Sequence, residues 1–189
     1  MAFSSIISVL DKINEKINLY IIHNTNDLIK NLPDYILQHK NLNDIIIQMF
    51  QSSQEYFPNV ENSHVSEATY YRLFLQDYID DGVDFLIYFD ADVICLKDPM
   101  PYLKLKIQSM NENKMEIGVM NQPGIPEVDI RSINLGINSG KYFNAGVMLI
   151  NYEKWLINNM LNELLEITRL REEDIVFWDQ DVLNIFFDG

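Results

Sequence analysis

Hydrophobic residues along the chain follow two periods, one typical of helices and the other typical of strands. Apolar side chains three or four positions apart predict an amphipathic helix over residues 4–15. Short apolar runs bounded by polar or turn residues predict strands over residues 17–23, 44–50, 85–90, 117–120 and 142–150.

Further helices are predicted over residues 26–39, 66–79, 153–167 and 179–187. Pro33 interrupts the first of them, and the second starts with Ser66 as N-cap and Glu67 in its first turn. Residues 122–140, with their prolines, glycines and asparagines, are predicted to form a long loop. Strands alternating with helices favour an α/β, Rossmann-like architecture, a mainly parallel central sheet flanked by helices, in a single domain of residues 1–189.

The strand predicted over residues 85–90 runs directly into Asp90-Ala91-Asp92. Ligands of parallel sheets bind beyond the carboxyl ends of the strands, which is where these two carboxylates fall. If the strand breaks there, both side chains can turn towards one point, where they repel each other unless a cation lies between them. Mg²⁺ and Mn²⁺ take oxygen ligands of this kind, usually together with substrate phosphates. A strand followed by an acidic, solvated turn explains the same residues, so both interpretations stay open.

Two other segments and one cation are candidates for a site. Asn144-Ala145-Gly146 interrupts an apolar strand, which indicates either the close approach of a ligand or a β-bulge. Asp179 opens the last predicted helix, where a simple cap is the favoured interpretation, and Asp181 is interpreted as serving only the first turn. Arg72 is one of few cations among many carboxylates, and a surface ion pair is its simplest interpretation.

Composition narrows the possible partners. The chain carries 28 acidic and 14 basic residues, a net charge of -14, which disfavours nucleic acid and anionic membranes because both need clustered Lys and Arg. A single cysteine, Cys95, suits a reducing compartment, and residues 1–5 lack the basic start of a signal peptide. A cytoplasmic protein without a transmembrane segment is therefore predicted.

Taken together, the segments closely resemble those of the family 8 glycosyltransferases, which include glycogenin and bacterial lipopolysaccharide galactosyl- and glucosyltransferases. Any one of the motifs is common, but all of them in this order are specific to the family. The segments that carry the resemblance are residues 3–10, 20–23, 69–73, 88–92, 142–151 and 179–184.

The resemblance implies a nucleotide-sugar transferase (GT-A-like) fold, a UDP-sugar donor, a saccharide or other hydroxyl acceptor, and retention of configuration at the anomeric carbon. It implies that Asp90 and Asp92 hold Mn²⁺, or Mg²⁺, against the diphosphate, with Ala91 beside the nucleoside. Gln180 would lie near the anomeric carbon and, with Asp179, is expected to be catalytic. The residues expected to contact the donor sugar or its phosphates are Arg72, Asn144, Ala145 and Asp179.

The chain departs from the family pattern at both ends. The match starts after the family's first strand, and the chain stops before the histidine and lysine that complete the metal and diphosphate site. We therefore expect a catalytic domain that is incomplete at both ends, an unpaired sheet edge near residues 19–22, and a possible homodimer through that edge.

Two other readings follow from the same residues. One is a non-catalytic remnant that only folds, or that binds partners or a nucleotide sugar weakly. The other is a haloacid-dehalogenase-type phosphatase, with Asp90 as nucleophile and Asp92 as acid/base. Such phosphatases follow this strand with one that ends in Ser or Thr, whereas the next candidate here ends in Val119-Met120-Asn121.

Overall fold

The computed structural model describes residues 2–24, 32–51, 57–58, 66–121 and 124–188. The chain divides into two compact units. The first comprises Met1–Ser52 and Phe89–Met115, and the second comprises Ser53–Tyr88 and Glu116–Gly189. Each unit contains its own helices, strands and buried core.

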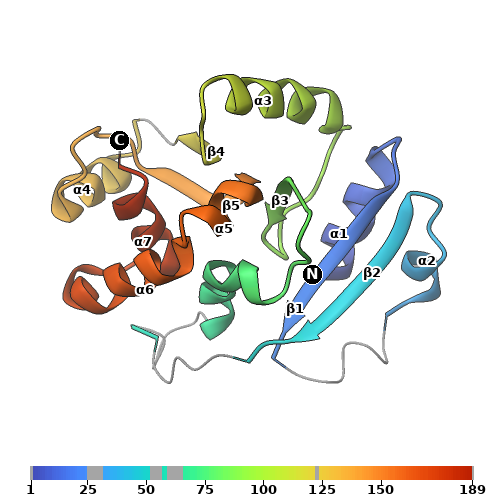
Figure 1. Ribbon diagram of the computed structural model, residues 1–189, viewed down its shortest axis with the longest axis horizontal. Helices are drawn as coiled ribbons and strands as arrows, with labels where there is room; N and C mark the ends of the chain where they lie inside the picture. The colour runs from blue at the N-terminus through green and yellow to red at the C-terminus, as the bar shows by residue number, and fades with distance from the viewer. Residues whose placement is uncertain (1, 25–31, 52–56, 59–65, 122–123, 189) are drawn as a thin grey trace. The chain divides into compact units, whose positions relative to one another are not determined.

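The first unit is built on a pair of parallel strands (Figure 1). Strand β1 pairs with β2 from Ile17 opposite Leu42 to His23 opposite Met49. Helices α1 and α2 pack against this pair through a buried cluster of Leu10, Ile13, Leu32 and Ile36. The elements of this unit are α1 (Ala2–Lys12), β1 (Ile17–His23), α2 (Asp34–Leu37), β2 (Leu42–Met49) and α3 (Met100–Glu112).

A buried amide ties α1 to the parallel pair. Asn41 precedes β2, and its Nδ2 donates hydrogen bonds to the carbonyl oxygens of Leu10, at 2.9 Å, and Ile13, at 2.7 Å. Both carbonyls belong to the C-terminal end of the helical segment, where the last carbonyls of a helix lack partners within the helix. The N-terminal segment is therefore a helix held onto the sheet, and residues 3–9 do not supply a strand.

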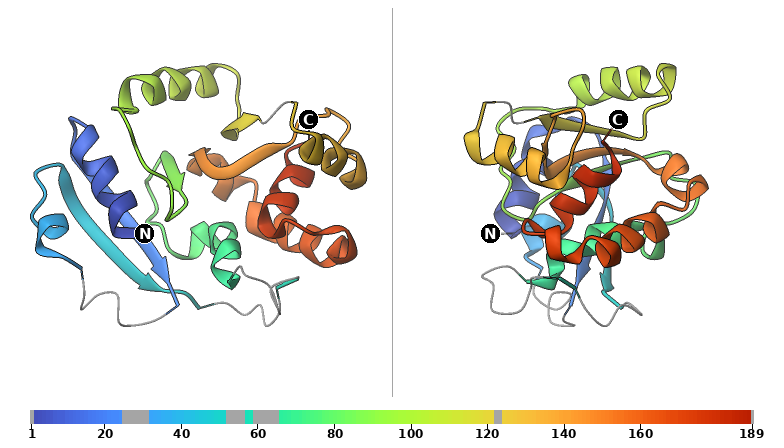
Figure 2. Two further views of the ribbon diagram at one scale, coloured as in Figure 1. Left: turned by 180° about the vertical axis from the view of Figure 1, so that it is seen from behind. Right: turned by 90° about the vertical axis from the view of Figure 1, so that its left-hand side faces the viewer.

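The second unit contains a three-stranded sheet in the order β3-β5-β4, in which β4 and β5 run antiparallel. Helices α6 and α7 and the 3-10 helix η2 contact one another, and α7 also contacts β5 (Figure 2). Its elements are η2 (Glu67–Asp77), β3 (Phe85–Phe89, whose last residue belongs to the first unit), β4 (Ile117–Asn121), α4 (Pro126–Leu135), β5 (Phe143–Asn151), α5 (Tyr152–Ile157), α6 (Met160–Leu170), η3 (Glu172–Asp174) and α7 (Trp178–Phe186).

All five predicted strands are present, and the α/β class is confirmed. The strand directions are mixed, because β1 and β2 run parallel whereas β5, which lies between β3 and β4, runs antiparallel to β4. The helix predicted over residues 26–39 falls partly on residues 25–31, which lie outside the described residues, and α2 follows Pro33. Among the described residues, no helix is long and apolar enough to cross a membrane.

The loop predicted over residues 122–140 was wrong for most of its described part, which forms α4. Pro126 occupies the first turn of this helix, where its missing N–H costs nothing. Gly136 ends it in the left-handed conformation, with φ 71°, a C-cap that glycine adopts without strain. The proline and glycine that indicated a loop instead mark the two ends of a helix.

Two other helix predictions need correction, and one helix was missed. The helix over 153–167 is two helices, because Asn159 adopts a left-handed φ of 52° between α5 and α6. The helix over 66–79 is a 3-10 helix with a kink at Phe74, and Ser66 precedes it without a side-chain capping hydrogen bond. Helix α3 was not predicted, because Pro99 and Pro101 at its start and the exposed Leu105 obscure its amphipathic pattern.

Candidate active site

Arg72 lies inside the second unit, so the prediction of a surface ion pair was wrong. Its side chain is 6% exposed, and its Nη1 donates a 2.5 Å hydrogen bond to the carbonyl oxygen of Ala145 in β5. Its guanidinium lies over the ring of Tyr88, 4.4 Å from the centroid, a favourable cation–π arrangement. The arginine therefore joins η2 to the strands β3 and β5.

Asp179 is paired with this arginine, a partner that the favoured sequence interpretation of a simple cap did not include, and the N-cap residue of α7 is Phe177. Its side chain is buried, and its Oδ2 lies 2.6 Å from Nε of Arg72. The Nε hydrogen is directed to the carbonyl oxygen of Thr69, so the contact with Oδ2 is ionic. The hydroxyl of Thr69 donates a hydrogen bond to Oδ1. A buried carboxylate needs such compensation, because unpaired burial of a charge costs several kcal/mol.

Gln180 has both ends of its amide engaged. Its Oε1 accepts a 3.0 Å hydrogen bond from the backbone N–H of Ala145, and its Nε2 donates to the hydroxyl of Tyr142 at 3.2 Å. The side chain is therefore held against the start of β5. Nearby in β5, the exposed Asn144 accepts a 2.9 Å hydrogen bond from the N–H of Gly146 through its own Oδ1.

Asp181 does much more than serve the first helical turn. It is fully buried and forms an ion pair with Arg131 of α4, whose Nη2 lies 2.5 Å from Oδ2. Its Oδ1 accepts a 2.7 Å hydrogen bond from the hydroxyl of Tyr142. Its Oδ2 also accepts 2.7 Å hydrogen bonds from the backbone N–H groups of Val176 and Phe177, which precede the helix. Asp181 thus organises the approach to α7 as well as its first turn.

Two residues of this network were missed at the level of sequence. Arg131 lies in the region predicted to be a loop, so there was no reason in the sequence to expect its side chain to be buried. Tyr142 belongs to a family segment but was given no role. The last turn of α7 is tied to the same strand by Asn184, whose Oδ1 accepts from the N–H of Phe143 at 2.7 Å and whose Nδ2 donates to the carbonyl oxygen of Phe143 at 3.0 Å.

The chain enters α7 through a strained residue. Trp178 has a left-handed φ of 49°, which is unusual for a residue with a large side chain. Conformations of this kind persist only where surrounding contacts impose them, and they cluster at functional sites. Here the hydrogen bonds that Asp181 accepts from Val176 and Phe177 hold the segment just before Trp178.

Asp90, Ala91 and Asp92 belong to the turn that follows β3, in the first unit. The N–H of Val93 donates a 3.1 Å hydrogen bond to the carbonyl oxygen of Asp90, which closes a tight turn. Ala91 and Asp92 are exposed, and Asp90 is half-buried. Two carboxylates on an open turn are a donor set that fits a hard divalent cation. Within the described residues, no group of three His, Cys, Asp or Glu side chains is placed to hold a metal ion.

The structure therefore brings together five of the eight predicted site residues, all in the second unit. These are Arg72, Asn144, Ala145, Asp179 and Gln180. The other three, Asp90, Ala91 and Asp92, share one turn in the first unit. That Asp90 and Asp92 face Asn144 and Gln180 stays a prediction.

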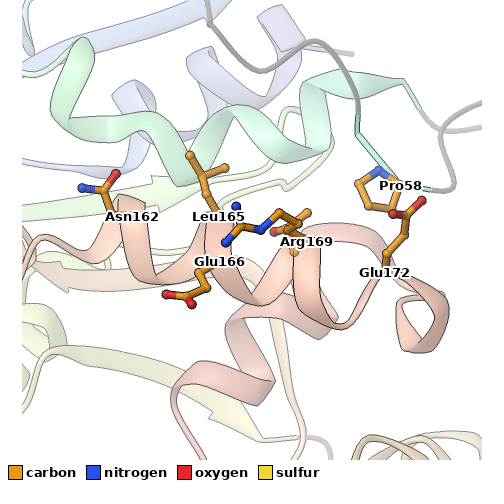
Figure 3. Close-up of a pocket in the computed structure, with 7 residues that line it drawn as sticks. Pro58, Asn162, Leu165, Glu166, Arg169 and Glu172 are labelled. Atoms are coloured by element: carbon orange, nitrogen blue, oxygen red, sulfur yellow. The ribbon is translucent and has the colours of Figure 1, made fainter.

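A pocket of about 310 Å³ lies elsewhere in the second unit. In Figure 3, the labelled residues Asn162, Leu165, Glu166 and Arg169 lie along α6, and Glu172 lies beyond the end of that helix, next to Pro58. It contains none of the predicted site residues, so we assign it no part in this site. Its lining residues are Pro58, Asn162, Leu165, Glu166, Thr168, Arg169 and Glu172.

Comparison with known protein families identifies the class. The family model described as glycosyl transferase family 8 matches residues 1–189, so the chain belongs to this family. Among curated relatives, general stress protein A of Bacillus subtilis is 32% identical over 128 residues, which are 66% of this chain and 42% of that protein. The lipopolysaccharide 1,3-galactosyltransferase of Salmonella typhimurium is 36% identical over 124 residues, which are 63% of this chain and 35% of that protein.

Solved structures show the same fold. The galactosyltransferase LgtC, solved in complex with donor and acceptor sugar analogues, matches with a TM-score of 0.81 at 23% identity, over 98% of this chain and 66% of that chain. The glycosyltransferase GlyE of Streptococcus pneumoniae TIGR4 matches with a TM-score of 0.65 at 21% identity, over 98% of this chain and 40% of that chain. The nucleotide-sugar transferase fold predicted from sequence is thereby confirmed.

The chain is shorter than the proteins that it resembles. It spans 42% and 35% of the two curated relatives described above. A lipopolysaccharide 1,2-glucosyltransferase of Escherichia coli matches over 97% of this chain at 27% identity, and that match covers 53% of the relative.

Proposed function

We propose that this protein is a retaining glycosyltransferase that moves a hexose from a UDP-sugar to a hydroxyl group of a saccharide acceptor, with Mn²⁺ or Mg²⁺ as cofactor. Membership of family 8 supports sugar transfer, and the relatives named as lipopolysaccharide galactosyl- and glucosyltransferases support a hexose and a role in surface-glycan synthesis.

The observation that carries the proposal is the polar network between η2, β5 and the start of α7. Burying two arginines and two aspartates is costly, and stability alone is better served by apolar residues of similar volume. The network holds the Oε1 of Gln180 against the N–H of Ala145 at 3.0 Å. An amide oxygen has two lone pairs, so this oxygen retains one acceptor position. That position suits the positive charge that develops on a sugar as its bond to phosphate loosens.

Asp179 is proposed to act on the donor through Arg72. Its carboxylate already receives the hydroxyl of Thr69 and the charge of Arg72. A carboxylate neutralised in this way is a weak nucleophile, but it fixes the arginine in place. A guanidinium held near a diphosphate would stabilise the negative charge that the leaving group gains.

Asp90 and Asp92 are proposed as the protein ligands of the divalent cation. Such a cation, when bound, neutralises charge on the leaving diphosphate. The turn closed by Val93 presents both carboxylates two residues apart on an open segment. With two protein ligands, the remaining coordination positions suit the oxygens of a diphosphate, so affinity for the cation should depend on UDP.

Retention of configuration is proposed to arise from attack on the face that the diphosphate leaves. A double displacement needs a nucleophile on the enzyme, and an amide is a poor one. The Nε2 of Gln180 is also committed to the hydroxyl of Tyr142, which keeps the amide in a fixed orientation. Stabilisation of the cationic sugar by the amide oxygen is then the remaining task for this side chain.

The test measures release of UDP from UDP-galactose and UDP-glucose, with Mn²⁺ and with chelator, and determines the anomeric form of the product by NMR. Gln180→Ala should lower kcat by about 100-fold. Gln108→Ala is the matched control, because Gln108 is an exposed glutamine of α3. UDP release that is equal in metal and in chelator, or an inverted product, would contradict the proposal. UDP binding without turnover in the unaltered protein would favour the non-catalytic reading.

A further inference from the structure

We propose that Tyr142 is a positioning residue that sets which way the side-chain amide of Gln180 points, and that Asp181 and Arg131 hold Tyr142 in this role. The inference rests on the proposed function of Gln180. The four residues come from α4, the residue just before β5, and α7, all within the second unit.

The direction of the hydrogen bonds follows from the carboxylate of Asp181. This carboxylate accepts from Nε of Arg131 at 3.1 Å and from the hydroxyl of Tyr142 at 2.7 Å. It also accepts from the backbone N–H groups of Val176 and Phe177. An ionised carboxylate has no hydrogen to donate, so the proton in the contact with Tyr142 must come from the tyrosine.

The hydroxyl of Tyr142 stays protonated for physical reasons. Burial raises the pKa of Tyr142, and the negative charge of Asp181 beside it raises this pKa further. A phenol has one hydrogen and two lone pairs, and here that hydrogen is committed to Asp181. Towards Gln180, therefore, the tyrosine can offer only an acceptor.

That acceptor fixes the amide of Gln180. In the observed orientation, Nε2 donates to the tyrosine oxygen at 3.2 Å and Oε1 accepts from the N–H of Ala145 at 3.0 Å. A flipped amide would place its NH₂ group against the N–H of Ala145 and its oxygen against a lone pair of Tyr142. Both contacts would then be mismatched, and the buried N–H of Ala145 would lose its acceptor, which disfavours the flipped orientation.

Arg131 completes the arrangement because it forms an ion pair with the carboxylate of Asp181 and holds that side chain in place. It is buried, its Nη2 lies 2.5 Å from Oδ2 of Asp181, and it also donates to the carbonyl oxygen of Asp174. Its guanidinium lies 5.9 Å from the ring centroid of Phe177. The order of action is thus from Arg131 to Asp181, then to Tyr142, and finally to the amide that would face the sugar.

The test replaces Tyr142 with phenylalanine, which removes the hydroxyl and keeps the ring. Tyr142→Phe should lower kcat about 10- to 100-fold and leave KM for the UDP-sugar within about twofold, as expected when an orienting hydrogen bond is lost. Tyr152→Phe is the matched control, because Tyr152 is also buried and its hydroxyl donates to the carbonyl oxygen of Ile79 at 3.0 Å. The control should keep its kcat.

A double-mutant cycle shows whether Tyr142 acts through Gln180. In a Gln180→Ala background, Tyr142→Phe should change kcat by less than about twofold, because residues acting in series are not additive. An equal loss of kcat in both backgrounds would overturn the proposal, as would an unchanged kcat in the single Tyr142→Phe variant.

A measurement without turnover separates this inference from the proposed function. The side-chain NH₂ resonances of Gln180, assigned by their loss in Gln180→Ala, should shift and exchange faster with water in Tyr142→Phe but not in Tyr152→Phe. Unchanged resonances would overturn the positioning role. If these resonances respond while Gln180→Ala keeps full turnover, the positioning role stands and the proposed function of Gln180 fails.

Discussion

The chain contains the pattern Asp-x-Asp twice, as Asp90-Ala91-Asp92 and as Asp179-Gln180-Asp181, and folds the two copies differently. The first lies on a tight turn, with Asp92 exposed. The second opens a helix, where Asp179 and Asp181 are 1% and 0% exposed. The same spacing of carboxylates therefore occurs in two different environments, an exposed turn and a buried helix start.

Secondary structure explains the difference. Residues i and i+2 of a helix point in directions that do not face each other, so two carboxylates there need separate partners. Asp179 is paired with Arg72 and Asp181 with Arg131. On the turn, Asp90 and Asp92 are two residues apart directly after a strand, and Asp92 is exposed, so an added cation could reach it. The helical copy is pre-organised by arginines, and the turn copy is suited to a bound metal.

The largest expected effect contrasts the two copies in stability. Asp181→Asn leaves the buried Arg131 without its counter-charge, so the free energy of unfolding should fall by about 3–5 kcal/mol. The same change at the exposed Asp92 should alter it by no more than about 0.5 kcal/mol, or raise it slightly by removing a like charge. Urea denaturation of both variants measures the difference. Equal losses of unfolding free energy in the two variants would contradict the expectation that burial makes Asp181 the more important residue for stability.

The pairing of Asp179 with Arg72 predicts a smaller, coupled effect. Arg72→Met and Asp179→Asn should each destabilise the protein, and the double variant should lose less than the sum, with a coupling energy of about 1–3 kcal/mol. Denaturation of the four proteins in the cycle gives this energy. Strict additivity would mean that the two buried side chains do not stabilise each other.

For the turn copy, the expected effect appears in ligand binding. Mn²⁺ should raise the affinity for UDP by at least about tenfold, roughly 1.4 kcal/mol, and Asp92→Asn should remove that increase. Asp81→Asn, at an exposed aspartate of the turn before β3, is the control and should retain it. Calorimetric titration of UDP with Mn²⁺ and with chelator gives the affinities. If the unaltered protein bound UDP equally well with Mn²⁺ and with chelator, the proposed role of the turn would be refuted.

The smallest expected effect concerns a third, partly exposed carboxylate, that of Asp188, which accepts hydrogen bonds from the backbone N–H groups of Asn138 and Ser139. Slight burial raises the pKa of Asp188, but hydrogen bonds from Ser139 and Asn138 outweigh this and hold it below its usual value. A lowered folded-state pKa adds stability above the unfolded value of about 3.9, which is lost as pH falls through the folded pKa.

Asp188→Asn should therefore lower the melting temperature slightly at pH 6, and the difference from unaltered protein should shrink as the pH falls and Asp188 takes up a proton. Thermal unfolding across this pH range provides the measurement. A difference that persists at the lowest pH would assign the effect to hydrogen-bond geometry rather than to charge.

Features that depend on residues close together in the chain could be predicted from the sequence, whereas contacts between distant segments could not. The strand over residues 17–23 was predicted with the observed bounds, because its apolar run is a local signal. Helix α4 was missed although Pro126 and Gly136 stand just inside its start and just past its end, the positions that such residues prefer. The sequence therefore does contain the start and end signals of this helix, although the same two residue types are also typical of loops.

By itself, the sequence determined the succession of strands, the turn at Asp90 and the family to which the chain belongs. These depend on residues close together in the chain, such as the hydrogen bond from Val93 to Asp90. Only the tertiary structure decided that Asp181 meets Arg131, 50 residues away, and that Asp179 meets Thr69, 110 residues away. Such pairings form when distant segments pack together and buried charges must find partners, and no local pattern encodes which partner that will be.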